Sequence, residues 1–284
     1  MHAHGPGSIL EALHAAGRGL PLWPACQCAA VLAASGWFLV RSRGAARALR
    51  PLLAVSFAGA AVGAALLSVL LRLPGWLRSD RPLSELMGGV VAYGALGGLV
   101  LSFAALVRWR RLPGLPALDR LAPCLWALVL LGRAGCFFAG CDFGTISGAP
   151  WAIRFPSAAP AFQDHLARGL VLATDRRSLP VHPTQVYEAI LGILMAAAAL
   201  AVERRGARRG APFWTAAAVY AAGRLALDPL RGDTAAAAWG PWAPSRWMSA
   251  ALLAAALIWM ASPRHASSSP TGVSETGAAG GNHL

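Results

Sequence analysis

The chain is a series of long apolar runs separated by short segments in which arginine, proline and glycine gather. A helix that crosses the hydrocarbon core of a bilayer needs about 20 residues, and seven of the runs come close to that length. They lie near residues 22–40, 51–71, 87–107, 118–136, 184–202, 212–228 and 245–261. The pattern therefore predicts an all-α fold, a polytopic transmembrane helix bundle with about seven spans.

Composition supports a membrane protein over a soluble one. Of 284 residues, 56% are hydrophobic and only 13% are charged, whereas a soluble domain has about 25% charged residues. The net charge of +13 comes from 25 basic residues, all of them arginine. These arginines lie between apolar runs of spanning length instead of forming a stripe on a soluble fold, so we expect no nucleic-acid partner.

The arginines also predict the orientation of the bundle. Basic residues close to a span are retained in the cytoplasm. Residues 41–50, 108–120 and 204–209 each hold four arginines, so these three connections are expected inside. The other connections are less densely basic, which places the N-terminus outside and the C-terminus in the cytoplasm.

Two segments outside the spans have their own character. The external connection of about residues 142–181 mixes Trp151, Phe155 and Phe162 with prolines, which predicts a folded cap instead of a slack linker. Residues 262–284 consist mainly of Ser, Gly, Ala and Thr, with few apolar side chains to bury, so we expect a disordered cytoplasmic tail. The predicted division is a bundle over residues 1–261 that carries the cap, followed by this tail.

Four clusters fall at the outer ends of the predicted spans although they are far apart in the sequence. They are AYGALGGL (92–99), LGRAGCFFAGCDFG (131–144), HPTQVYEA (182–189) and YAAGRLALDPLRGD (220–233). Glycines in the second cluster allow the chain to turn back sharply. The common depth of the second and fourth clusters predicts that Arg133 and Arg224 approach one another in the folded bundle.

Arg133 and Arg224 lie inside apolar runs. An arginine there costs from about 2.5 kcal/mol upward, so it needs a partner or a task. One interpretation is pairing with Asp142, Glu188 or Asp228 to tie helices together. The other is bidentate binding of a phosphate, which lipid headgroups supply at this depth. The residue chemistry alone leaves both interpretations open.

Several other polar residues in these clusters have two interpretations each. His182 precedes Pro183 at the start of a predicted helix, where it could cap the helix, lie at the membrane interface, or accept a proton near neutral pH. Gln185, Tyr187 and Glu188 are too close in sequence to face one direction. Tyr187 could belong to an interfacial aromatic belt, and Tyr93 could be a packing position.

The five cysteines, Cys26, Cys28, Cys124, Cys136 and Cys141, are an odd number without the paired CxxC units of a zinc site. We therefore expect neither a disulfide framework nor a metal ion, and no other cofactor is indicated. Cys136 and Cys141 are close enough to be bridged if the loop between them folds back. A membrane thiol-redox protein that uses this pair is one alternative function, and it would need a thiolate of low pKa.

The clusters, in this order, resemble the prolipoprotein diacylglyceryl transferases, which are enzymes of the bacterial inner membrane. The resemblance runs from about Leu83 to Ser249. GRAGCFFAGCDFGT is similar to the family signature GRxGNFxNGExxGxxT, and LDRLAP (118–123) is similar to its lead-in. PWAIRFP, HPTQVYEA and the stretch from Tyr220 to Arg231 are similar to the segments that follow.

The resemblance implies a transferase that moves diacylglyceryl from phosphatidylglycerol to the thiol of a lipobox cysteine in a preprolipoprotein and releases glycerol phosphate. Membrane lipids would surround it as further partners. Arg133 and Arg224 match arginines that the family needs for activity. The implied set of catalytic residues is Arg133, Arg224, His182 and Tyr93. The implied set of substrate-binding residues is Tyr220, Arg231, Asp228, Glu188, Asp142, Gly135 and Gly140.

The chain departs from the family pattern at named positions. The two asparagines of the signature read Cys136 and Ala139, its glutamate reads Cys141, and the histidine of the HGGL motif reads Tyr93. His182, Asp142 or Tyr93 would then have to accept the thiol proton. Two further alternatives follow, a lipid-binding or assembly homologue without catalysis and an enzyme that uses another acceptor. Transport is disfavoured because no span pairs acidic residues at mid-depth.

Overall fold

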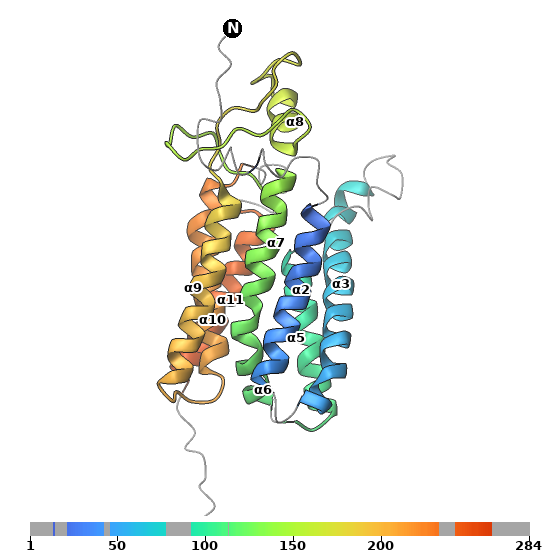
Figure 1. Cartoon of the computed structure of the whole chain (residues 1–284), viewed down its shortest axis with the longest axis vertical. Helices are drawn as coiled ribbons and strands as arrows, with labels where there is room; N and C mark the ends of the chain where they lie inside the picture. The colour runs from blue at the N-terminus through green and yellow to red at the C-terminus, as the bar shows by residue number, and fades with distance from the viewer. Residues whose placement is uncertain are drawn as a thin grey trace, which may run out of the picture.

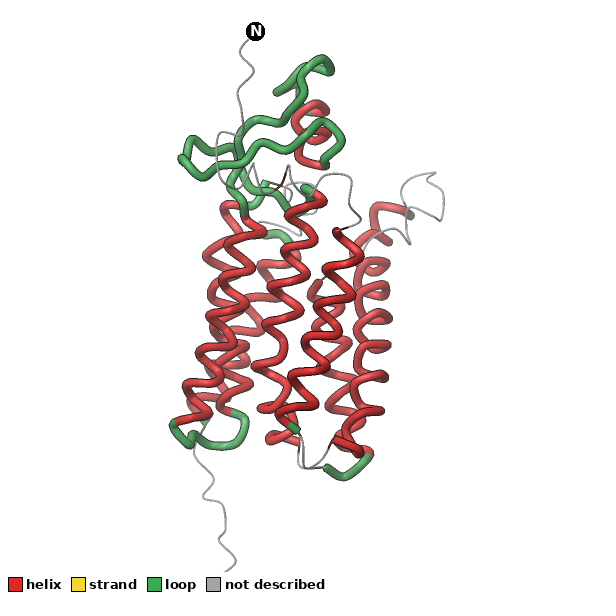
Figure 2. The backbone as a smooth tube through the Cα atoms, in the orientation of Figure 1, coloured by secondary structure: helices red, strands yellow, loops and turns green. Residues whose placement is uncertain are grey.

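The computed structural model describes His14 and residues 22–42, 46–77, 92–112, 114–232 and 242–262. Its long helices are α2 (Leu22–Arg41), α3 (Ala46–Trp76), α5 (Ala92–Trp109), α7 (Leu125–Ala139), α9 (Thr184–Arg204), α10 (Ala211–Leu227) and α11 (Pro244–Ala261). Figure 1 shows them running side by side along one axis. In the described residues the extended segments pair only as isolated bridges, and Figure 2 shows helix and loop throughout. The predicted all-helical fold is confirmed.

Four helical stretches are long and apolar enough to cross a membrane, namely Leu22–Arg41, Pro51–Leu71, Gly114–Ala139 and Thr184–Arg204. The helix Tyr93–Trp109 is a shorter apolar one. The third predicted span, 87–107, corresponds to α5, which begins at Ala92 and ends at Trp109; residues 87–91 lie outside the described residues. The disordered tail predicted for 262–284 also lies outside them from residue 263 onward.

The fourth predicted span, near 118–136, lies within the helical stretch Gly114–Ala139, which is longer at both ends. The helical stretch begins earlier, with α6 (Gly114–Leu121), passes through a 3₁₀ turn η2 (Ala122–Cys124) and continues as α7 to Ala139. Pro123 lies in that turn, and a proline has no N–H for the helical ladder. The buried carboxylate of Asp119 in α6 accepts hydrogen bonds from the backbone N–H groups of Gly210 (2.6 Å) and Phe213 (3.1 Å). Because these N–H groups open α10, Asp119 fixes the start of that helix.

Helices α3 and α5 approach each other backbone to backbone. Gly59 and Gly63 on α3 face Gly94 and Gly98 on α5, and a Cβ atom at any of the four would overlap the facing backbone or side chain. Small residues allow this approach, and in a bilayer such packing supplies much of the attraction between helices. The other main helix pairs are α2 with α7, α7 with α9, α9 with α10, and α10 with α11.

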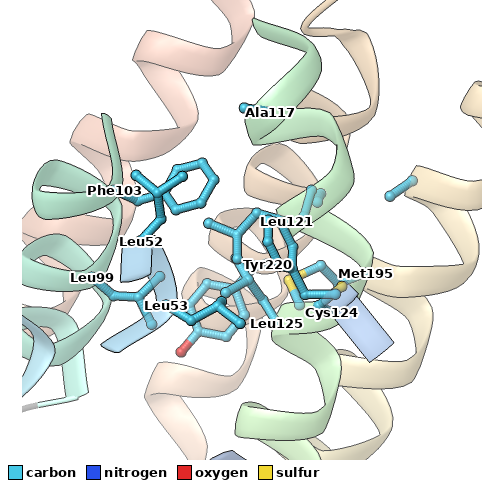
Figure 3. Packing of buried hydrophobic residues seen from close by; sticks show 14 of the residues in the cluster. Leu52, Leu53, Leu99, Phe103, Ala117, Leu121, Cys124, Leu125, Met195 and Tyr220 are labelled. Carbon is cyan, nitrogen blue, oxygen red and sulfur yellow. The ribbon is translucent and has the colours of Figure 1, made fainter. Parts of the chain in front are cut away.

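The apolar core lies between the helices. Its buried members include Leu52 on α3, Phe103 on α5, Leu121 on α6, Leu125 on α7 and Tyr220 on α10. Figure 3 shows these side chains packed together. The core thus joins the helices on both sides of α7, whose far end carries Arg133.

Residues 142–181 form a cap at one end of the bundle, with the short helix α8 (Pro160–Ala167) inside it (Figure 1). The cap has its own apolar cluster, which includes Phe143, Ile153, Phe155 and Val181. Backbone hydrogen bonds join Ile153 and Val181 in both directions, at 3.0 Å each. The cap is therefore folded, as its aromatic residues predict.

Candidate functional site

The site begins where α7 ends. Gly140 adopts a left-handed conformation (φ 72°), its N–H bonds the Phe137 carbonyl at 3.3 Å, and the Cys141 N–H bonds the Cys136 carbonyl at 3.2 Å. This is the Schellman arrangement, in which a glycine turns the chain back across the helix end. Asp142 follows with φ 54°. The turn therefore directs its carboxylate back toward Arg133, which lies nine residues earlier in the chain, on α7.

Glu188 on α9 is the centre of the site. Its side chain is 1% exposed, and it forms ion pairs with three arginines from different parts of the chain. Arg133 approaches with Nε at 2.7 Å, Arg224 with Nη1 at 2.5 Å and Arg231 with Nη1 at 3.0 Å. Arg133 and Arg224, both predicted from their place in apolar runs, therefore meet at one carboxylate.

Asp142 is the second carboxylate of the site. It accepts from Arg133 Nη1 at 2.5 Å and from Arg231 Nη2 at 3.0 Å. Its side chain is 29% exposed, which makes it the most exposed side chain among the ion-paired residues around Glu188. Burial opposes ionisation, but the charges of Arg133 and Arg231 outweigh it and hold the pKa of Asp142 well below its usual range.

Residues at the start of α9 hold the turn in place. The Thr184 hydroxyl donates to the Asp142 carbonyl at 2.6 Å, and the Gln185 amide donates to the Cys141 carbonyl at 2.6 Å. Both side chains are fully buried. The sequence predicts no role for Thr184; the signal for both is their position one turn before Glu188 in HPTQVYEA.

Arg231 is positioned by the cap. Gly144 forms an antiparallel bridge with Arg231, the Thr145 N–H bonds the Leu230 carbonyl at 2.7 Å, and the Gly232 N–H bonds the Phe143 carbonyl at 3.0 Å. A Cβ atom at Gly144 would overlap the His182 and Leu230 backbone. The segment after α10 is thereby fastened to the segment after α7.

Asp228 lies beside the cluster and connects it to α11. It begins the 3₁₀ turn η3 (Asp228–Leu230), and its carboxylate accepts from Arg246 Nε at 2.9 Å and Ser245 Oγ at 3.1 Å, with Arg224 Nη2 at 3.9 Å. Arg246 and Ser245 were not predicted, although an arginine near the end of an apolar run is the same signal as at Arg133. Four arginines and three carboxylates then leave one positive charge in excess.

Tyr93 and Tyr220 form a ring pair close to the arginines, because Tyr220 lies one turn before Arg224 on α10. The rings of Tyr93 and Tyr220 lie 6.3 Å apart, and the Tyr93 hydroxyl forms a hydrogen bond with Ser249 on α11. Tyr220 is buried. Gly135 has a different task, because a Cβ there would meet Trp23 and Cys26 at 3.2–3.3 Å, which lets α2 pack closely against α7.

His182 belongs to a second polar group, at the surface of the cap. Its Nδ1 lies 3.1 Å from the Tyr187 hydroxyl, which also accepts from Trp151 Nε1 at 2.6 Å. One interpretation of His182, that it caps the helix, is wrong, because Pro183 occupies the N-cap of α9. Tyr187 and Glu188 indeed face different directions, one toward the cap surface and one toward the arginines.

Cys136 and Cys141 are both free and half-buried. A sulfur of each and an oxygen of Asp142 lie within 4.8 Å of one another, a grouping that the sequence does not predict as a metal site. Both oxygens of Asp142 are already engaged by arginines. The three residues therefore do not offer a ready set of ligands.

The comparisons with known proteins agree with the residue-level picture. The family model described as prolipoprotein diacylglyceryl transferase matches residues 20–262. Proteins named phosphatidylglycerol–prolipoprotein diacylglyceryl transferase are similar to this chain in Clostridium tetani (28% identical over 63% of this chain and 66% of that protein) and Geobacter sulfurreducens (32%, 51% and 49%). The match to the protein of that name from Parasynechococcus marenigrum is 32% identical over 51% of each chain. The chain spans about half to two thirds of the length of these relatives.

Proposed function

The chain belongs to the prolipoprotein diacylglyceryl transferase family, and from this premise we propose that it transfers diacylglyceryl from phosphatidylglycerol to the thiol of a lipobox cysteine. The names of its relatives support this donor and this acceptor class. The acceptor thiolate would attack the glyceryl carbon that carries the phosphate. A thioether forms, the C–O bond breaks, and glycerol phosphate leaves with the electron pair.

The observation that carries the proposal is the convergence of Arg133, Arg224 and Arg231 on Glu188. Guanidinium groups already fixed in position stabilise charge that develops on a leaving phosphate without further reorganisation. Arg224 Nε is buried and has no hydrogen-bond partner among the described residues. A phosphate oxygen would satisfy that donor, which otherwise costs about 1–3 kcal/mol.

Glu188 and Asp142 have different roles in this scheme. Glu188 is almost fully buried and holds three arginines, so it positions them. Asp142 is more exposed and bridges Arg133 and Arg231, so a lipid phosphate would displace it from these two groups. Losing its arginines would raise the pKa of Asp142, because their charges are what lowers it.

Asp142 is therefore the residue that best fits the acceptance of the thiol proton once the donor lipid is bound. His182 fits this role less well, because its ring is hydrogen-bonded to Tyr187 in the cap. Tyr93 and Tyr220 help to position the donor from beneath, together with Asp228 and its partner Arg246. Gly135 and Gly140 act through the backbone, by helix packing and by the turn.

The same proposal places the protein in the bacterial inner membrane as a multi-pass bundle of seven spans, with the cap outside and the C-terminus in the cytoplasm. The four stretches long enough to span support it, and α5, α10 and α11 lie alongside them (Figure 1). The cap end of the bundle, where the arginines gather, would then face the side on which lipobox peptides emerge. The predicted division into bundle, cap and tail belongs to this proposal as well.

Purified chain, phosphatidylglycerol vesicles and a lipobox peptide test the function directly. We expect the peptide to gain the mass of diacylglyceryl, and we expect the chain to restore growth in a bacterium depleted of its transferase. Lipid binding without transfer would instead favour a non-catalytic homologue, which the tyrosine at the HGGL position motivates. Transfer to a different thiol or alcohol would favour another acceptor.

Asp142→Asn separates binding from proton acceptance. The amide keeps the size of the side chain but is not a base, so transfer should fall about 100-fold or more while phosphatidylglycerol binding is maintained. The exposed carboxylate of Glu203, paired with Arg41, offers the control Glu203→Gln, which should leave transfer unchanged. Equal transfer by Asp142→Asn and the unaltered chain would exclude Asp142 as the base.

A further inference from the structure

Two thiols are brought together by the turn that ends α7. In a Schellman turn the residue three before the last of the helix and the second residue beyond the helix are neighbours, and here these residues are Cys136 and Cys141. The N–H of Cys141 bonds the Cys136 carbonyl at 3.2 Å, and the Cys141 sulfur lies 3.8 Å from the same oxygen. The two sulfurs are no more than 4.8 Å apart.

This geometry suits a disulfide. The bond needs sulfurs about 2.05 Å apart and Cα atoms within about 7 Å, and the backbone hydrogen bond already holds the two residues together. The sulfurs, no more than 4.8 Å apart, would approach each other further by side-chain rotation. Both residues are half-buried, so a small oxidant or the flexible end of a protein disulfide can reach them.

The other described cysteines lack this arrangement. Cys26 and Cys28 are two residues apart on α2, and side chains at that spacing do not face each other on a helix. Cys124 is buried, and its thiol donates to the Arg120 carbonyl. Among the described cysteines, Cys136 and Cys141 are thus the pair whose positions suit a disulfide bond.

The pair is directly connected to the arginine cluster. Asp142 follows Cys141 in the chain and bridges Arg133 and Arg231, while Cys136 lies one turn after Arg133 on α7. In the family signature GRxGNFxNGExxGxxT, the position of Cys136 is an asparagine and the position of Cys141 is a glutamate. A covalent link between them would therefore restrain the turn that presents Asp142.

The acidity of one thiol is consistent with reactivity. A hydrogen bond from the Cys136 thiol, together with the charge of Arg133, lowers the pKa of Cys141 against the effect of burial. The thiolate is the form that attacks disulfides. Cys141 would then be the attacking residue and Cys136 the resolving one.

We propose that Cys136 and Cys141 form a reversible disulfide that locks the turn after α7 and holds Asp142 between Arg133 and Arg231. Cys141 attacks a sulfur of an oxidant disulfide, such as that of an oxidoreductase or oxidised glutathione, and releases one thiol. Cys136 then attacks the Cys141 sulfur and releases the second thiol. Two protons and two electrons pass from the pair to the oxidant. The expected effect of the disulfide on transfer rests on the proposed function, whereas the formation of the disulfide does not.

A redox titration of the full chain in detergent tests the bond. The protein is equilibrated in glutathione buffers of different ratio, free thiols are alkylated, and trypsin releases Ala134–Arg154, which contains both cysteines and no others. We expect an unalkylated peptide lighter by two hydrogen atoms in oxidising buffer and a doubly alkylated peptide in reducing buffer. Double alkylation at every ratio would overturn the proposal. Cys136→Ala and Cys141→Ala should abolish the bridge, and Cys26→Ala should preserve it.

Thermal unfolding in the two redox states tests the lock. The oxidised chain should unfold roughly 2–4 °C higher or more, and Cys136→Ala should show no difference between the two buffers. Equal unfolding temperatures of the bridged and reduced chain would overturn the lock. Transfer is assayed after glutathione is removed, so that the acceptor thiol is not itself oxidised. The bridged chain should transfer more slowly than the reduced chain, because Asp142 is held between its arginines, and Cys136→Ala should show no such difference. Absence of transfer in both states would contradict the proposed function and leave the peptide result standing.

Discussion

The arginines of the site have two interpretations, structural pairing and phosphate binding, and their common partner Glu188 makes the two compatible. A buried carboxylate is costly unless it is paired, and Glu188 is paired with three guanidinium groups. The same pairing fixes the forks of Arg133, Arg224 and Arg231 before any ligand arrives. With Arg246 included, four arginines face the three carboxylates of Glu188, Asp142 and Asp228, and the one positive charge in excess favours an anionic ligand.

The replacement of arginine by lysine separates the two roles. Lysine keeps the charge but has no planar fork, and Arg133 uses Nε and Nη1 on two different carboxylates. We expect Arg133→Lys and Arg224→Lys to remain folded and to lose turnover. Each missing charge-assisted bond is worth on the order of 1.5–3 kcal/mol, which corresponds to a roughly ten- to hundredfold slower transfer.

Turnover and thermal stability in detergent should be measured on the same samples. Arg41→Lys is the matched control, because Arg41 pairs with the carboxylate of Glu203 at 2.5 Å, outside the arginine cluster. It should transfer at the normal rate. Unchanged turnover in both site variants would contradict phosphate binding, and a parallel loss of stability and turnover would assign these arginines to helix tying.

The sequence could predict the chemistry of the site residues but not which of them touch. An arginine in an apolar run signals a partner or a task wherever it occurs, so Arg133 and Arg224 were predictable. Their common partner Glu188 depends on the rotation of α9, which the polar residues around it do not determine. Thr184 and Gln185 bind backbone carbonyls of the turn; their position one turn before Glu188 marks them as candidates, but it does not identify the carbonyls that they contact.

At the scale of elements, the glycine contact between α3 and α5 gives a sharp prediction. A Cβ at Gly98 would overlap the Gly59 carbonyl, whereas at Gly97, on another face of α5, it would meet nothing within 4 Å. We expect Gly98→Ala to destabilise the bundle by about 1–3 kcal/mol, since overpacking forces the backbones apart. Gly97→Ala should be neutral or slightly stabilising, because alanine favours a helix.

Thermal unfolding of both variants in the same detergent measures this difference. The two changes add the same atom to adjacent residues of one helix, so their effects on helix propensity cancel in the comparison. A lower unfolding temperature for Gly98→Ala alone is the expected result. Equal temperatures would mean that α3 and α5 separate at little cost.

The cap should respond to pH through His165. Its Nδ1 accepts from the Leu179 N–H at 3.2 Å, and burial lowers its pKa. A group with a lowered pKa in the folded state binds a proton more readily once unfolded, so stability is lost as pH falls through its ordinary value of about 6.5. Amide protection factors, which correct the exchange rate for its intrinsic dependence on pH, should therefore fall in residues 160–180 below that pH. The variant His165→Asn, which keeps an acceptor without titrating there, should remove the dependence.

Element boundaries show where sequence reasoning fails. Hydropathy predicts that an apolar run continues, and it does not predict that the 3₁₀ turn around Pro123 joins α6 to α7 as one longer stretch. Helix α8 was not predicted either, because a short helix inside a mixed cap lacks a long periodic pattern. The run limits of α9, α10 and α11 agree within a few residues with the predicted spans, since arginine, proline or glycine bounds each of them.

At the scale of the whole molecule, charge and fold divide the bundle into two ends. The ends of α2, α5 and α9 that carry arginine in their last turn lie opposite the cap in Figure 1. The connection from α9 to α10 is fastened there by Arg208, which lies 3.9 Å over the Trp259 ring of α11. The helix ends that flank the loops predicted to be cytoplasmic thus share one end of the bundle, and the arginine site lies at the other.

Topology reporters test this arrangement in living bacteria. Fusions after Arg50, Arg111 or Arg209 should read cytoplasmic, because arginine-dense connections are retained inside. An insertion within residues 160–175 of the cap should read external, because one further span separates it from the connection at 108–120. Alkaline phosphatase and a fluorescent protein at each position provide opposite signals, so poor expression cannot imitate either reading. A cytoplasmic cap would place the arginine site on the side where lipobox peptides do not emerge, and an external reading at Arg209 would overturn the seven spans. Agreement of all four positions would establish that Glu188, Asp142 and their arginines face the outer leaflet, where both proposed substrates are available.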